Sequence, residues 1–162
     1  MKKQISMAAA VLMAVSGFAG RMAYAQETSE PTVVRATIGS EPDNLNPWLS
    51  AATDTEAVFQ NVFEGLVRYD SEGAIIPGLA ESWEISDDGL TYTFHLRNDV
   101  IFHNGKKFTA ADVIYTYENL SGLNGEKALS SKFSSITNLE APDDYTVVMT
   151  LSNANAAFLQ FT

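Results

Sequence analysis

The sequence contains no cysteine, so disulfide bonds and thiol chemistry are excluded and the fold must be held together by burial. Positive charge is also scarce, because ten Lys and Arg residues stand against twenty Asp and Glu, which gives a formal net charge of −10. Such a surface repels nucleic acids and anionic lipids, so we expect no nucleic-acid partner. Hydrophobic residues make up 46% of the chain, which is enough material for a buried core.

A hydrophobic run of membrane-spanning length is missing as well. The apolar stretch at about residues 7–19 follows two lysines and ends near the small-x-small sequence at residues 23–25. It is shorter than the roughly 20 residues of a membrane helix. These features predict that residues 1–25 are a cleaved signal peptide, and they favour this interpretation over a membrane anchor. No cysteine follows the run, so a lipoprotein anchor is excluded.

Removal of the predicted signal peptide would make the protein more acidic. Residues 1–25 contain Lys2, Lys3 and Arg21 but no acidic residue, so the formal charge would change from −10 to −13. We therefore expect an exported protein that begins with a polar leader at residues 26–32.

The first part of the exported chain predicts a strand, a loop and a helix. β-Branched residues alternate at residues 33–38, which is typical of a strand. The segment "SEPDNLNP" that follows is rich in Pro, Asp and Asn and predicts a loop. Thr53 and Glu56 have the spacing of a capping box, so a helix is expected to begin there. Gly65 is predicted to end this helix in the left-handed conformation.

The strictest periodicity lies in "LTYTFHLR", residues 90–97, where apolar and polar side chains alternate. The pattern predicts a half-buried antiparallel strand. A turn at Asp88-Gly89 would pair this strand with the segment that contains Trp83 and Ile85.

Further along, the sequence predicts a second helix, a hairpin and the start of a third helix. Thr109 is expected to cap the second helix, with Asp112 at its positive end. The hairpin turns at residues 142–144, and the third helix starts in "ANAAFLQFT" without a terminal cap, which indicates a fragment. The side chains expected to share one core are Trp83, Phe94, Ile114 and Tyr117.

No arrangement of residues predicts catalysis or metal binding. His95 and His103 are the only histidines, and no further ligands stand beside them at metal-binding spacing. A nucleophile elbow of the form GxSxG is absent. The acidic pairs at residues 87–88 and 143–144 lie in predicted turns, where Asp accepts backbone hydrogen bonds, so a turn role is favoured over a glycosidase dyad. We therefore expect no enzyme activity, cofactor or metal.

The order of several motifs carries more information than any of them alone. From about Val34 to the last residue, the sequence resembles the N-terminal region of the family 5 extracellular solute-binding proteins, the periplasmic receptors of peptide, opine and nickel ABC importers. The resemblance rests on "SEPDNLNP", "EGLV", "PGLAESWE", "DGLTYTFHLR" and "FTAADV", which occur here in that order.

The resemblance implies an α/β fold of the periplasmic-binding-protein-like class II type, with two lobes that enclose the ligand. Residues 33–162 would form the N-terminal part of the solute-binding domain, a mixed-sheet first lobe that is incomplete. The segment with both histidines would then be framework of this lobe.

The same resemblance places the ligand. In the family's peptide receptors, the segment after the "L-x-P" turn runs along the wall of the cleft, and its backbone pairs with the peptide. In this sequence that wall contains Ala51, Ala52 and Thr53, whose small side chains would let a peptide approach the main chain. The alternative is that these residues only lead into a helix that Thr53 caps.

We therefore expect a solute-binding component that captures a peptide-like solute, acts as a monomer and delivers the solute to an inner-membrane ABC permease. Two alternatives remain at this stage. One is a secreted hydrolase with its catalytic residues outside this sequence, and the other is a ligand-sensing domain.

Overall fold

The computed structural model describes residues 35–50 and 52–162. The predicted signal peptide, the polar leader and Ala51 lie outside the described residues. Within the strand expected at residues 33–38, residues 35–38 are described and are not in a strand. A strand needs a neighbouring backbone to pair with, and no pairing with residues 35–38 occurs among the described residues.

The first described helix, α2, runs from Thr53–Phe59. Its N-cap is Ala52, whose carbonyl accepts the Glu56 amide at 3.0 Å, and no side chain caps the helix. The predicted capping box with Thr53 as N-cap is therefore wrong, because the helical hydrogen bonds begin one residue earlier. The helix is also shorter than expected, since Gln60 already forms its C-cap.

Gly65 has a different role from the predicted helix end. It is not among the glycines with positive φ. A Cβ atom at this position would lie 2.8 Å from the carbonyl oxygen of Thr162. Next to it, the Leu66 amide donates to that same oxygen at 2.8 Å. The position therefore requires glycine because two backbone segments approach closely, not because of its conformational freedom.

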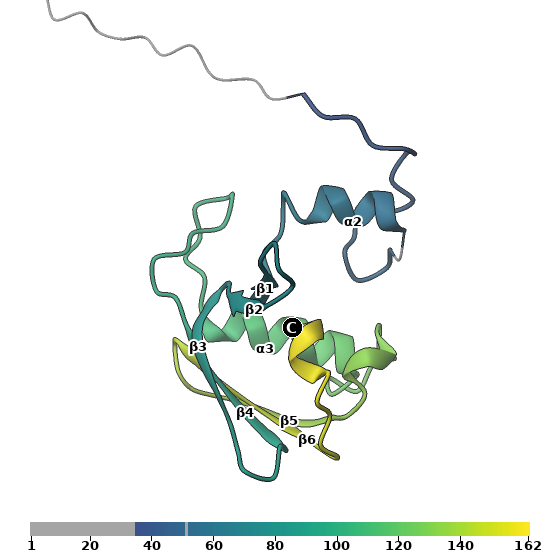
Figure 1. Ribbon diagram of the computed structural model, residues 1–162. Helices are drawn as coiled ribbons and strands as arrows, with labels where there is room; N and C mark the ends of the chain where they lie inside the picture. Colours follow the sequence, from purple (N-terminus) through teal and green to yellow (C-terminus); the bar gives the residue numbers. More distant parts are fainter. Residues whose placement is uncertain (1–34, 51) are drawn as a thin grey trace, which may run out of the picture. The chain divides into compact units, whose positions relative to one another are not determined.

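The strands form two antiparallel sheets (Figure 1). The smaller pairs β1 with β2, and the larger has the order β3-β4-β6-β5. The strands are β1 Val67–Tyr69, β2 Ile75–Pro77, β3 Ala80–Ile85, β4 Thr91–Leu96, β5 Ile136–Asp143 and β6 Thr146–Leu151. The predicted α/β class is confirmed, but the mixed sheet expected for the first lobe is not found among the described residues, where every pairing between these strands is antiparallel.

The alternation of the predicted strand is confirmed in β4. Tyr92, Phe94 and Leu96 are buried on one face, while the intervening residues are half-buried. The β3–β4 hairpin turns at Gly89, which has a φ of 69°. The left-handed conformation of this residue explains the Asp-Gly sequence of the turn.

The second predicted helix is α3, Ala110–Ser121, and it begins as expected. The Thr109 amide donates to the Asp112 carboxylate at 3.0 Å, which closes the N-terminal end. Gly122, with a φ of 84°, ends the helix in the left-handed conformation. None of the described helices is both long enough and apolar enough to cross a membrane.

The core lies between α3 and one face of the larger sheet (Figure 1). Phe94 and Tyr117 are buried in it, and Trp83 and Ile114 pack against it while half-buried. The predicted shared core is therefore confirmed, with two of its members at the edge. Short 3-10 helices occupy Ser131–Phe133 (η1) and Phe158–Phe161 (η2), so the expected third helix is only a short 3-10 turn.

Candidate functional site

The predicted loop before α2 is folded by its own asparagines. The Asn44 side chain accepts the Asn46 amide at 2.8 Å, and the Asn46 side chain accepts the Trp48 amide at 2.9 Å. The Asn46 carbonyl accepts the amides of Leu49 and Ser50 at 3.0 and 3.3 Å. Side-chain to backbone bonds of this kind stabilise tight turns. The "L-x-P" sequence of the family corresponds to Leu45-Asn46-Pro47 in this chain, and the structure has a hydrogen-bonded turn here, at residues 46–49.

A carboxylate joins this loop to the first turn of α2. The Asp43 Oδ1 atom accepts the Ser50 hydroxyl at 2.5 Å and the Thr55 hydroxyl at 2.7 Å. The Asp43 amide in turn donates to the Thr55 hydroxyl at 3.2 Å. The hydrogen bonds from Ser50 and Thr55 hold the pKa of the Asp43 carboxyl below its usual value.

The predicted ligand wall is described at two of its three residues, because Ala51 lies outside the described part of the chain. Ala52 is half-buried and extended, with φ −80° and ψ 130°. Its amide donates to the Ser50 hydroxyl at 3.3 Å. Thr53 is the exposed first residue of α2. The role of these three residues in ligand binding stays a prediction.

The two histidines make separate contacts with the framework. His95, on β4, has its Nε2 atom 3.7 Å from the Glu84 carboxylate, and 41% of its side chain is exposed. The His103 Nε2 atom lies 3.2 Å from the carbonyl oxygen of Val62. No group of three His, Cys, Asp or Glu side chains able to hold a metal ion occurs within residues 35–50 and 52–162.

One Asp of each acidic pair accepts a turn hydrogen bond as predicted, and the second hairpin turns at residues 144–145, not at residues 142–144 as expected, because Asp143 still pairs with Thr146 in the sheet. The Asp88 carboxylate accepts the Leu90 amide at 3.0 Å, and the Asp143 carboxylate accepts the Tyr145 amide at 2.8 Å. Hydrogen bonds lower the pKa of both carboxyls, chiefly the bond from the Ser86 hydroxyl at Asp88 and the bond from the Tyr145 amide at Asp143. A glycosidase acid would instead need a raised pKa.

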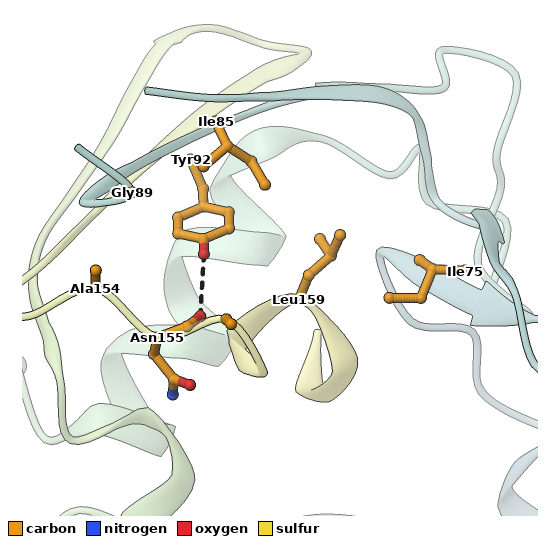
Figure 2. Close-up of a pocket in the computed structure, with 8 residues that line it drawn as sticks. Ile75, Ile85, Gly89, Tyr92, Ala154, Asn155 and Leu159 are labelled. Atoms are coloured by element: carbon orange, nitrogen blue, oxygen red, sulfur yellow. Dashed lines mark hydrogen bonds between the residues drawn. The ribbon is translucent and has the colours of Figure 1, made fainter. Parts of the chain in front are cut away.

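A hollow of about 410 Å³ is lined by residues that are distant in the sequence from the predicted wall residues. The close-up shows Ile75, Ile85 and Leu159 around it, with the Tyr92 hydroxyl donating to the Asn155 carbonyl at 3.2 Å (Figure 2). Its lining contains no charged side chain. Ligand sites usually combine apolar walls with a few convergent polar groups, so this hollow is a weaker candidate than the loop before α2.

The sequence did not predict the hydrogen bond between Thr55 and Asp43, which joins the loop to α2. The spacing of Thr53 and Glu56 predicts a helix cap at Thr53, whereas the buried, hydrogen-bonded hydroxyl is that of Thr55, two residues later. Its partner lies twelve residues earlier in the chain. An Asp in an Asn-rich loop before a Thr-containing helix start is the only signal, and loops of that composition are common.

Comparison with known proteins connects this chain to solute binding. The family model described as "Bacterial extracellular solute-binding proteins, family 5 Middle" matches residues 74–162. Di/tripeptide-binding protein 1 of Pseudomonas aeruginosa is 37% identical over 129 residues, which cover 68% of this chain and 24% of that protein.

Two solved structures show the same similarity in three dimensions. NikZ of Campylobacter jejuni, in complex with Ni(L-His), matches with a TM-score of 0.69 and 36% identity over 76% of this chain. AgaA from A. tumefaciens R10, in complex with agropinic acid, matches with a TM-score of 0.69 and 37% identity over 75%. The chain spans 24% of the length of each of these proteins.

Proposed function

Because the chain belongs to family 5 of the bacterial extracellular solute-binding proteins, we propose that the full-length protein captures a peptide-like solute in the periplasm and delivers it to an ABC importer. The 37% identity with a di/tripeptide-binding protein over 129 residues carries this proposal. The expected fold, part of the first lobe of a two-lobed binding protein, is confirmed by the structural similarities.

The loop before α2 supports a peptide as the solute. Ala52 and Thr53 follow a turn that is fixed by its own hydrogen bonds, although the amide and the carbonyl of Ala52 are themselves bonded to the Ser50 hydroxyl and the Glu56 amide. No bulky side chain stands at these two positions. An extended peptide recognised through main-chain hydrogen bonds requires such an approach, and recognition of this kind tolerates many peptide sequences. The opposite wall of the cleft would come from the remainder of the two-lobed protein.

Isothermal titration of the full-length protein with dialanine and trialanine tests the proposal. We expect saturable binding of at least one of them with one site per protein, and we expect the peptide to be recovered intact, because the relatives are binding proteins and not enzymes. Ni(L-His) and agropinic acid serve as comparison solutes. Binding of either comparison solute without binding of a small peptide would replace the proposed solute class, and peptide hydrolysis would contradict the proposed lack of enzyme activity.

The proposed location and partners follow from the same function. We propose export with cleavage after Ala25, action as a monomer and docking to an inner-membrane permease, with no nucleic-acid partner. The protein purified from the periplasm is expected to begin at Gln26, and N-terminal sequencing checks this. An intact N-terminus in the cytoplasmic fraction would contradict it.

A further inference from the structure

The sequence contains two Asn-Gly dipeptides, at residues 104–105 and 124–125. Asparagine is one of the thermolabile residues of proteins, and its reaction partner is the backbone nitrogen of the residue that follows. When that residue is glycine, no side chain shields the nitrogen and the backbone can adopt the conformations that bring it near the carboxamide carbon. The attack is intramolecular, so no second molecule has to be oriented first. Both dipeptides are therefore candidate sites of spontaneous deamidation.

The backbone around the two glycines is open. Gly105 and Gly125 have φ values of 85° and 84°, in the left-handed region. A Cβ atom built on either glycine would meet no heavy atom within 4 Å apart from its chain neighbours. The preceding residues, Asn104 and Asn124, are both exposed. The space in which a ring would form is therefore accessible at both sites.

The two carboxamides differ in how they are held. At each site the asparagine Oδ1 atom accepts the amide two residues later at 3.0 Å, from Lys106 at the first and from Glu126 at the second. The Asn124 Nδ2 atom also donates to the Asn119 Oδ1 atom at 3.0 Å. Among the described residues, the Asn104 Nδ2 atom makes no such bond. Because this nitrogen is the leaving group, its bond holds Asn124 in the unreacted form.

We propose that Asn104 is a deamidation site of this protein and that Asn119 protects Asn124 from the same reaction. The Gly105 backbone nitrogen loses its proton to solvent and bonds to the Asn104 Cγ atom. The bond from Cγ to Nδ2 breaks, and the nitrogen takes up a proton and leaves as ammonia. Water then opens the resulting cyclic succinimide at one of its carbonyls. The product is aspartate with the original backbone, or isoaspartate with an additional backbone carbon.

The two products should have different effects on the hairpin at residues 101–107. In this hairpin the Phe102 amide donates to the Lys106 carbonyl, and the Gly105 amide donates to the Phe102 carbonyl, both at 2.8 Å. Aspartate at position 104 still offers an acceptor to the Lys106 amide, so the turn is retained. Isoaspartate lengthens the backbone inside the turn, so these bonds cannot all keep their geometry. We therefore expect only the isoaspartate form to loosen the hairpin.

Incubation of the full-length protein at mildly alkaline pH, followed by peptide mapping with mass spectrometry, measures both sites in one sample. We expect Asn104 to react about fivefold faster than Asn124, which is the factor that one hydrogen bond contributes. The same incubation in guanidinium chloride should remove the difference, because the contact between Asn124 and Asn119 is lost on unfolding. Asn104→Gln identifies the first site, since glutamine closes a larger ring slowly, and it should abolish the conversion at this position.

Asn119→Ala and Asn119→Asp separate the protecting contact from the local sequence. Both variants lose the bond that the Asn119 Nδ2 atom donates to the Tyr115 carbonyl. They differ in the acceptor for Asn124, which alanine removes and aspartate keeps. We expect Asn124 to react about fivefold faster in Asn119→Ala and at nearly the wild-type rate in Asn119→Asp. The rate at Asn104 should be unchanged in both variants.

Hydrogen exchange of the separated products tests the effect on the hairpin. Amides in residues 101–107 should exchange about fivefold faster in the isoaspartate form, and at the wild-type rate in the aspartate form and in Asn104→Asp. Wild-type exchange in the isoaspartate form would overturn the predicted loosening.

The rates themselves decide the proposal. Equal rates at Asn104 and Asn124 in the folded wild type, or no reaction at Asn104, would overturn it, and this comparison needs no variant. A difference that persists in guanidinium chloride would assign it to the local sequence and overturn the role of Asn119. An unchanged rate at Asn124 in Asn119→Ala would overturn that role as well.

Discussion

Replacing Phe94 with alanine should lower the free energy of unfolding by about 3–5 kcal/mol. Phe94 stands at the centre of β4 and is 0% exposed. Its neighbours across the sheet are Trp83 on β3 and Val147 on β6, and its ring lies 6.4 Å from the ring of Tyr92. Truncation therefore removes contacts on several sides at once and leaves a cavity that the sheet cannot close, since both neighbouring strands are fixed by backbone hydrogen bonds.

The measurement is urea unfolding of the full-length variant, followed by circular dichroism. Trp83→Ala is the matched comparison, because Trp83 is directly opposite Phe94 but only half-buried. Its change should be clearly smaller, because part of its surface is in water in the folded state as well. Equal losses for the two variants would contradict the described difference in burial.

Replacing Ala52 with tryptophan should weaken peptide binding about tenfold or more, while the melting temperature changes little. Ala52 is half-buried at the start of α2, so a larger side chain has room to turn toward solvent without disturbing the core. If a peptide pairs with this backbone, however, the indole would occupy the space that the peptide needs. A steric block of this kind lowers affinity without lowering the stability of the unliganded protein.

Ala57→Trp is the matched control for this experiment. Ala57 is exposed on the same helix, beyond the first turn. The control should bind trialanine as the wild type does, and calorimetry of both variants gives the comparison. Unchanged affinity in Ala52→Trp would remove Ala52 from the ligand wall, and equal losses in the two variants would point to a general effect on α2.

The elements that the sequence predicted correctly are those determined by local patterns. The alternation in β4 requires only that one face be buried, and the start of α3 requires only Thr109 and Asp112, which are three residues apart. The turn at Gly89 likewise depends on neighbouring residues. Such signals lie within a few residues of the feature that they predict.

The incorrect predictions involve partners that are distant in the sequence. The local sequence predicts a helix end at Gly65, but glycine is required there because the Thr162 carbonyl lies too close for a Cβ atom. Thr162 is far away in the sequence, so no local pattern indicates this contact. The local sequence predicts a helix cap at Thr53, but the threonine whose hydroxyl is hydrogen-bonded is Thr55. Its partner, Asp43, belongs to the preceding loop. The predicted ligand wall came from a resemblance and not from local chemistry, which explains why the hydrogen bonds that Asp43 makes with Ser50 and Thr55 beside it were not predicted.

The strand order β3-β4-β6-β5 also has a consequence for the time course of folding. The pairs β3–β4 and β5–β6 are hairpins whose strands can meet after closing a short loop. The central pair β4–β6 joins Thr91 to Thr150 and His95 to Thr146, with all of α3 in between. Loop-closure entropy grows with the length of chain enclosed, and contacts between distant residues slow folding. The β4–β6 pairing therefore has the largest entropic barrier of the three pairings in this sheet, although its two strands lie in the most buried part of the folded structure.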